Sequence, residues 1–160
     1  MRILFVCMGN ICRSPTAEGV MRRLVEQAGV GDRVEVESAG TGGWHAGEAP
    51  DERAALAARR RGVRLAGAAR QVRAADFRDF DLLIAMDREN LRELLALAPD
   101  EDAAEKVRLL REFDPASSGA LDLDVPDPYY GGDRGFETVL DMVEAAWRGL
   151  LDDLRAAEQV

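Results

Sequence analysis

The chain has 160 residues, of which 47% are hydrophobic and 32% are charged, a mixture typical of one globular domain rather than a disordered segment. Its formal net charge of −9 at pH 7 argues against a protein that binds mainly nucleic acid or an anionic membrane, although one local cationic site can still bind an anion. Two cysteines five positions apart and the absence of any long apolar run exclude a disulfide-stapled domain and a membrane span, and we expect a cytoplasmic protein.

The N-terminal part of the chain begins with a strand and a helix. Ile3–Val6 is a short apolar run that predicts a strand buried on both faces. Ser14 and Pro15 predict the start of a helix, with Ser14 as its capping residue, and apolar residues recur at helical spacing up to Gly29. The alternating stretch 33–38 predicts a second strand.

The remaining elements continue this alternation. We expect a helix over 51–61, a strand over 82–86, a helix over 88–97 and a short strand over 107–110. The segment 112–135 is rich in proline and glycine and predicts a long irregular connection, which at this length is usually functional or disordered. Apolar residues then repeat at helical spacing from Val139 to Leu154 and predict a long terminal amphipathic helix.

Strands that alternate with helices predict a single-domain, doubly wound α/β fold over residues 1–160, with a mainly parallel central sheet and helices on both faces. Ligands of such sheets bind outside the carboxyl ends of the strands. The loop Cys7–Arg13 follows the first predicted strand directly. We therefore expect the functional site at this loop.

The residue types of this loop favour anion binding next to a nucleophile. Gly9 and Asn10 tolerate left-handed backbone angles, so the loop can curl and turn successive N–H groups inward as an anion nest. The helix N-terminus adds the positive end of its dipole, and Arg13 adds a planar fork that matches two phosphate oxygens. Cys7, at the strand end, would lie under this cradle, where a thiolate is stabilised.

The stretch Cys7-Met8-Gly9-Asn10-Ile11-Cys12-Arg13-Ser14-Pro15 contains Cys-x5-Arg-Ser, which resembles the phosphate-binding loop of cysteine-dependent phosphatases. The longer pattern, near the N-terminus, resembles the low-molecular-weight protein tyrosine phosphatases. The resemblance covers essentially the whole chain through Ser38-Ala39-Gly40, Trp44, Pro50-Asp51, Ala69-Arg70-Gln71, Met86-Asp87, Asn90-Leu91 and Asp127-Pro128-Tyr129-Tyr130. Cys-x5-Arg alone is a weak signal, whereas the nine-residue loop together with the downstream Asp-Pro-Tyr-Tyr is specific.

The resemblance implies hydrolysis of phosphotyrosine through a phosphocysteine intermediate, with no metal and no cofactor. Cys7 would be the nucleophile, and Arg13 would stabilise the transition state together with the loop amides. Asp127 would protonate the leaving phenolate and then activate water. Ser14 would donate a hydrogen bond to the Cys7 sulfur, and Asn10 would hold the loop in its strained shape.

The same resemblance implies a substrate slot. Trp44, Ile11 and Tyr129 match positions that line the aromatic slot of the family, and a deep slot favours phosphotyrosine over the shorter phosphoserine. The implied substrate- and phosphate-binding set is Met8, Gly9, Asn10, Ile11, Cys12, Ser14, Trp44 and Tyr129. The implied partner is a phosphotyrosine-containing protein, with inorganic phosphate as the product. We expect a monomer or weak dimer with no nucleic-acid or membrane partner.

Three positions leave alternatives open. Cys12 is either a packing residue or the partner of Cys7 in a reversible, protective disulfide. Gly67 stands where the family often has a histidine that supports the loop asparagine, and the single histidine, His45, is expected at the rim of the slot. Asp87, which follows a buried strand, fits a helix cap and a support for the loop equally well.

Other functions remain possible on the same residues. In the related arginine phosphatases the position of Ile11 is typically threonine, so Ile11 favours phosphotyrosine over phosphoarginine. A thioredoxin-coupled arsenate reductase needs further cysteines, and this chain has none after Cys12. A phosphoprotein-binding module without turnover is the alternative from a different class, and the intact set of Cys7, Arg13 and Asp127 argues against it.

Overall fold

The structure, a computed structural model, describes residues 1–157 apart from the side chains of Tyr130 and Asp133. Its centre is a four-stranded sheet in the order β2-β1-β3-β4 with every neighbouring pair parallel. The strands are β1 (Arg2–Cys7), β2 (Glu35–Gly40), β3 (Leu82–Ala85) and β4 (Val107–Leu109). This confirms the predicted doubly wound α/β fold with a parallel sheet.

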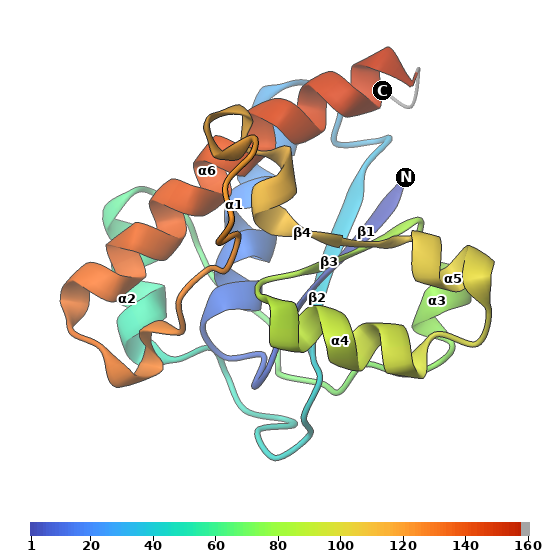
Figure 1. The fold of residues 1–160 in the computed structure, drawn as a ribbon. Coiled ribbons are helices and arrows are strands. Elements are labelled where there is room, and N and C mark those ends of the chain that lie inside the picture. The colour runs from blue at the N-terminus through green and yellow to red at the C-terminus, as the bar shows by residue number, and fades with distance from the viewer. Residues whose placement is uncertain (158–160) are drawn as a thin grey trace.

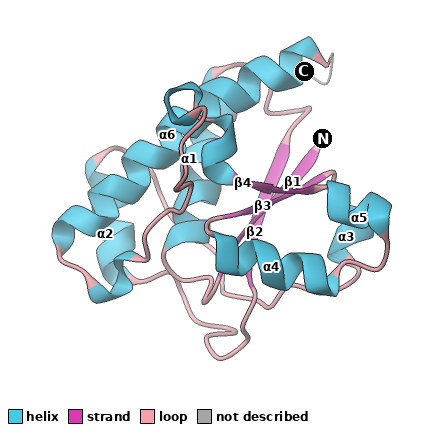
Figure 2. Cartoon of the chain, in the orientation of Figure 1, coloured by secondary structure: helices cyan, strands magenta, loops and turns pink. Residues whose placement is uncertain are grey.

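Helices cover both faces of the sheet (Figures 1 and 2). On one face lie α1 (Arg13–Gln27), α2 (Glu52–Arg60) and α6 (Asp133–Ala156). On the other lie α3 (Asp76–Asp79), α4 (Arg88–Leu97) and α5 (Glu101–Glu105). A 3₁₀ turn, η1 (Leu110–Phe113), follows β4 and takes up the last residue of the strand predicted over 107–110. Two more, η2 (Pro115–Ser117) and η3 (Pro128–Tyr130), lie within the segment predicted to be irregular.

The alternation of side chains along β1 explains why its sequence is apolar throughout. Ile3, Phe5 and Cys7 pack into the core under α1 and α6, while Leu4 and Val6 pack into the core under α4. A parallel strand that is buried on both faces reads as a continuous apolar run. The same alternation carries Cys7, the last residue of β1, into the layer from which α1 starts.

The start of α1 differs from the prediction in one respect. The helix begins at Arg13 with Cys12 as its N-cap, and no side chain caps it. The prediction of Ser14 as the cap is therefore wrong, because its hydroxyl turns inward to the Cys7 sulfur instead. The helices α3 and α5 were not predicted, since segments of four and five residues are too short to show helical periodicity.

No helix within residues 1–157 has the length and apolar character that a membrane crossing requires.

Candidate active site

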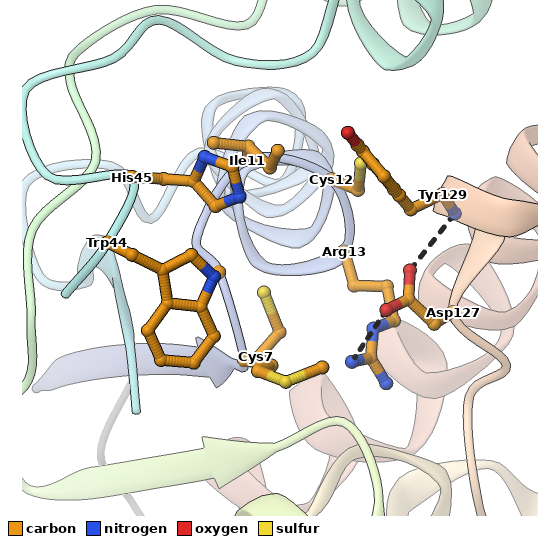
Figure 3. A pocket seen from close by; sticks show the side chains of 10 residues that line it. Cys7, Ile11, Cys12, Arg13, Trp44, His45, Asp127 and Tyr129 are labelled. Carbon is orange, nitrogen blue, oxygen red and sulfur yellow. Dashed lines mark hydrogen bonds and ion pairs between the residues drawn. The ribbon is translucent and has the colours of Figure 1, made fainter. Parts of the chain in front are cut away.

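A pocket of about 190 Å³ opens where β1 ends and α1 begins (Figure 3). It lies at the carboxyl edge of the sheet, next to the point where the strand order reverses because β2 and β3 flank β1 on opposite sides. Its lining residues are Cys7, Met8, Gly9, Ile11, Cys12, Arg13, Trp44, His45, Asp127 and Tyr129. Every predicted site residue lines it except Asn10 and Ser14, which are buried.

The backbone of the loop after β1 is turned so that its carbonyl groups face neighbouring segments. The carbonyl oxygens of Cys7 and Met8 accept hydrogen bonds from the amides of Thr41 and Gly42, at 2.9 and 3.0 Å. In the described part of the chain, the amides of residues 8–13 donate to no protein group. Unpaired amides at a helix N-terminus can bind an anion, so the predicted anion nest at this loop stays a prediction that these free donors support.

Asn10 is the residue that fixes this turn. It has a φ of 57°, a left-handed conformation that asparagine tolerates better than most residues. Its Nδ2 donates to Ser14 Oγ at 2.8 Å and to Ser38 Oγ at 3.0 Å, and its Oδ1 accepts from the Arg70 amide at 3.0 Å. Two serine hydroxyls and one backbone amide therefore hold Asn10 in this chain, where Gly67 has no side chain to offer.

Cys7 lies at the floor of the pocket. Its Sγ is 3.0 Å from Ser14 Oγ, and only 3% of the residue is exposed. Ser14 Oγ also receives the hydrogen bond from Asn10. The hydroxyl that faces the sulfur is thus held in place by the same asparagine that shapes the loop.

Arg13 carries the positive charge of the site. Its side chain is 3% exposed, and its Nη1 donates to Asp87 Oδ2 at 2.6 Å and to the Val125 carbonyl at 3.0 Å. Burial alone would lower the pKa of Arg13, but the charges of Cys7 and Asp87 raise it above its ordinary value. The guanidinium therefore stays charged, and Asp87 fixes its orientation as a buried cation requires.

Asp127 reaches the pocket from the loop that precedes α6. Its Oδ1 accepts a hydrogen bond from the Tyr129 amide at 3.0 Å, and its Oδ2 lies 3.8 Å from Arg13 Nη2 (Figure 3). Its side chain is 30% exposed, so the carboxyl group can meet both a substrate and water. This is the access that a group exchanging protons with both requires.

The upper walls of the pocket are aromatic. Figure 3 shows Trp44 and Tyr129 on opposite sides of the opening, with Ile11 and His45 between them. The Trp44 ring packs directly on Gly42, where an added Cβ would lie 1.9 Å from the indole. His45 lies beside Trp44 in the pocket lining, as expected for a rim residue, and its Nδ1 pairs with Glu48.

Cys12 lies in the pocket wall as a second free thiol. Burial, followed by the negative charge of Asp51, raises the pKa of Cys12 to about 12. Its thiol is thus almost fully protonated near neutral pH. A reversible disulfide between Cys12 and Cys7 stays a prediction.

Sequence reasoning missed part of the surroundings of these residues. For Asp87 the sequence leaves a helix cap and a loop support open, and the structure gives it both contacts: its Oδ1 caps α4 through the Asn90 amide, and its Oδ2 accepts a hydrogen bond from Arg13. The Val125 carbonyl and the Arg70 amide are backbone groups and leave no signal in a single sequence. Within residues 1–157, no group of three or more His, Cys, Asp or Glu side chains is arranged to bind a metal.

Comparisons with known proteins agree with this geometry. The family model described as "Low molecular weight phosphotyrosine protein phosphatase" matches residues 2–160. A low molecular weight protein-tyrosine-phosphatase of Streptomyces coelicolor is 57% identical over 159 residues, which is 99% of this chain and 95% of the relative. The crystal structure of a protein tyrosine phosphatase from Entamoeba histolytica matches with a TM-score of 0.92 and 37% identity, covering 99% of both chains. A Drosophila arginine phosphatase, DARP, matches with a TM-score of 0.87 and 32% identity over 96% of this chain and 97% of that chain.

Proposed function

The chain belongs to the low-molecular-weight phosphotyrosine protein phosphatase family and is a protein tyrosine phosphatase, and from this premise we propose that Cys7, Arg13 and Asp127 carry its reaction. The observation that supports these roles most strongly is the position of the Cys7 sulfur. It lies at the floor of a pocket whose backbone amides are unpaired within the described chain and whose wall contains a buried guanidinium. This is a nucleophile beneath a site for a tetrahedral anion.

In the first step the Cys7 sulfur attacks phosphorus, and the bond between phosphorus and the tyrosine oxygen breaks. Asp127 donates its proton to the departing phenolate oxygen. The amides of residues 8–13 and the Arg13 fork bind the equatorial oxygens, whose charge grows in the transition state. In the second step, when the Cys7 sulfur is the leaving group, the Ser14 hydroxyl donates a hydrogen bond to it.

In the second step a water molecule attacks the phosphorus of phosphocysteine, and Asp127 accepts a proton from it. The bond between sulfur and phosphorus breaks, Cys7 returns as a thiolate, and inorganic phosphate leaves. Each step uses the carboxyl group in the protonation state that the previous step produced. The positive charge that the phosphoryl group needs comes from Arg13 and the loop amides, so we expect activity in the presence of a chelator.

The substrate we propose is the phosphotyrosine side chain of a protein. Trp44 and Tyr129 stand on opposite sides of the opening, where each can contact a phenyl ring, and Ile11 adds an apolar surface between them. Because the sulfur lies below these walls, a short phosphoserine side chain would have to bring its backbone into the slot to reach it. The wall residues therefore account for selectivity, and the floor accounts for chemistry.

The proposal extends to the organisation and setting of the protein. One phosphatase domain over residues 1–160 is supported by the family match over residues 2–160. A reducing cytoplasm fits the two free cysteines, one of which must stay reduced for activity. We propose a monomer or weak dimer that meets its phosphotyrosine substrate transiently, without nucleic-acid or membrane partners.

Trapping the intermediate tests the assigned roles. The Asp127→Ala variant should slow hydrolysis of phosphocysteine, so acid quenching during turnover of p-nitrophenyl phosphate should give a peptide with one phosphoryl group on Cys7. The Cys7→Ser variant serves as the control and should give none. A phosphoryl group on another residue would contradict the mechanism. So would the absence of any phosphorylated peptide from an Asp127→Ala variant that still hydrolyses the substrate.

A further inference from the structure

We propose that Arg53 is a positioning residue that holds the loop of the general acid in register with the phosphate-binding loop. The inference rests on the role of Asp127 proposed above. Arg53 is the second residue of α2 and does not line the pocket. Its guanidinium instead connects two segments that each carry part of the site.

The first set of contacts joins Arg53 to the segment after Asp127. Arg53 Nη2 donates to the Tyr129 carbonyl oxygen at 3.1 Å. Its Cζ lies 5.3 Å from the centroid of the Tyr129 ring and 5.0 Å from that of the Phe136 ring. A guanidinium at these distances is attracted to the faces of both rings. One side chain therefore holds the backbone and the ring of the same tyrosine.

The second set of contacts joins Arg53 to the phosphate-binding loop. Its Nε and Nη2 each lie 3.3 Å from an oxygen of the Asp51 carboxylate. That carboxylate also caps α2, because it accepts the amides of Arg53 and Ala54 at 2.8 and 3.4 Å. The Asp51 amide in turn donates to the Ile11 carbonyl oxygen at 2.8 Å. The α2 N-terminus is thus fixed to the loop that binds phosphate.

Together these contacts place Asp127 between two anchors. On its N-terminal side, the Val125 carbonyl accepts a hydrogen bond from Arg13 at 3.0 Å. On its C-terminal side, Tyr129 donates its amide to the Asp127 carboxylate at 3.0 Å (Figure 3). The carbonyl oxygen of the same Tyr129 accepts the hydrogen bond from Arg53. Loss of Arg53 removes these contacts between Tyr129 and α2. We expect the Tyr129 amide, and with it the Asp127 carboxyl group, to be held less firmly, while the contacts of Cys7 and Arg13 are unchanged.

This arrangement makes a selective prediction. A misplaced general acid slows the hydrolysis of substrates whose leaving group needs a proton. It has little effect on the hydrolysis of substrates whose leaving group departs as a stable anion. Loss of Arg53 should therefore act on the leaving-group dependence of kcat/KM, which reports the steps up to phosphocysteine. The affinity for a phosphate mimic should not change, because the loop amides and Arg13 are untouched.

The experiment compares Arg53→Met, which keeps the length and apolar stem of the side chain, with Arg59→Met on the same helix. Arg59 is an exposed arginine in the last turn of α2, at the opposite end of the helix from Asp51, so it is a matched control. We would measure kcat/KM for phenyl phosphate and for difluoromethylumbelliferyl phosphate, together with the inhibition constant of vanadate. Arg53→Met should lower the phenyl phosphate value about tenfold and the other value less than about twofold, with vanadate inhibition unchanged.

Two further variants keep the outcome decisive. Arg53→Lys should give an intermediate loss of kcat/KM with the same selectivity. An ammonium group can bind either the Tyr129 carbonyl oxygen or the Asp51 carboxylate, but it has no planar fork to bind both. Asp127→Asn separates the two proposals. If Asp127→Asn is selective and Arg53→Met is uniform or silent, or Arg59→Met matches Arg53→Met, the positioning role of Arg53 is wrong. If Asp127→Asn itself shows no selectivity, the acid assignment fails and the inference fails with it.

Discussion

The raised pKa of Cys12 predicts that this thiol is nearly inert at neutral pH, although it lies in the wall of a reactive site. Burial and the charge of Asp51 raise its pKa to about 12, and 5% of the residue is exposed. At pH 7 the thiolate fraction is then about 10⁻⁵, against about 3% for an ordinary thiol. The greater nucleophilicity of a more basic thiolate recovers about 30-fold, so Cys12 should react about 10²-fold more slowly than free cysteine, before any steric protection.

The assay uses the Cys7→Ser variant, in which Cys12 is the single remaining thiol. This variant also removes the charge of Cys7, a smaller contributor to the raised pKa of Cys12, whereas burial and Asp51 stay in place. Its rate of reaction with the disulfide reagent DTNB is compared with that of N-acetylcysteine from pH 7 to 10. Because the pKa lies above this range, the Cys12 rate should rise about tenfold for each pH unit, while that of the reference thiol levels off above about pH 8.5. A protein rate within a few-fold of the reference, or one that levels off with it, would refute the reasoning.

Two controls assign the cause of this low reactivity. Asp51→Asn removes the neighbouring negative charge while keeping a helix-capping side chain, so it should lower the pKa of Cys12 and raise its rate. Unfolding the Cys7→Ser variant in urea removes the burial and should bring the rate to that of N-acetylcysteine. If neither change raises the rate, then burial and Asp51 are not its causes.

Three further substitutions test the floor and walls of the pocket. Arg13→Lys keeps the charge but loses the fork between Asp87 and the phosphate, so kcat should fall about 10²–10³-fold, and a near-normal kcat would argue against the fork. Gly40→Ala places a Cβ 2.7 Å from the Met8 carbonyl oxygen. This overpacking should lower the free energy of unfolding, measured in urea, by roughly 1–3 kcal/mol. Gly31→Ala, whose added Cβ would have ordinary contacts of 3.8 Å or more, is the control. Gly42→Ala displaces the Trp44 ring, so it should raise KM for a phosphotyrosine peptide with little change in the melting temperature. An unchanged KM would show that Trp44 does not bind the substrate.

The elements that sequence reasoning predicted well are those whose signals are local. The apolar run of β1, the glycine and asparagine of the next loop and the start of α1 are contiguous, so pattern and residue type together indicated an anion site with Cys7 beneath it. The same local reasoning failed at Ser14. A serine followed by proline is a common helix start, yet here the hydroxyl contacts the nucleophile.

The parts that could not be predicted depend on long-range contacts. The Val125 carbonyl that accepts a hydrogen bond from Arg13 lies 112 residues further along the chain, and the Arg70 amide that fixes Asn10 is 60 residues away. Both partners are backbone groups, which any residue type could supply. The contact between Arg53 and the Tyr129 carbonyl spans 76 residues and has the same character. Such contacts follow from the packing of α2, α4 and the acid loop around the sheet, not from any motif.

The central claim is that Cys7 serves as the nucleophile of a tyrosine phosphatase that needs no metal. Phosphate release from matched phosphotyrosine and phosphoarginine peptides, in the presence of a chelator and with Cys7→Ser alongside, tests this most directly. The account predicts that the phosphotyrosine peptide is turned over in chelator, that the phosphoarginine peptide is a much poorer substrate, and that Cys7→Ser abolishes release. Turnover mainly of phosphoarginine, loss of activity in chelator, or release that survives Cys7→Ser would contradict it.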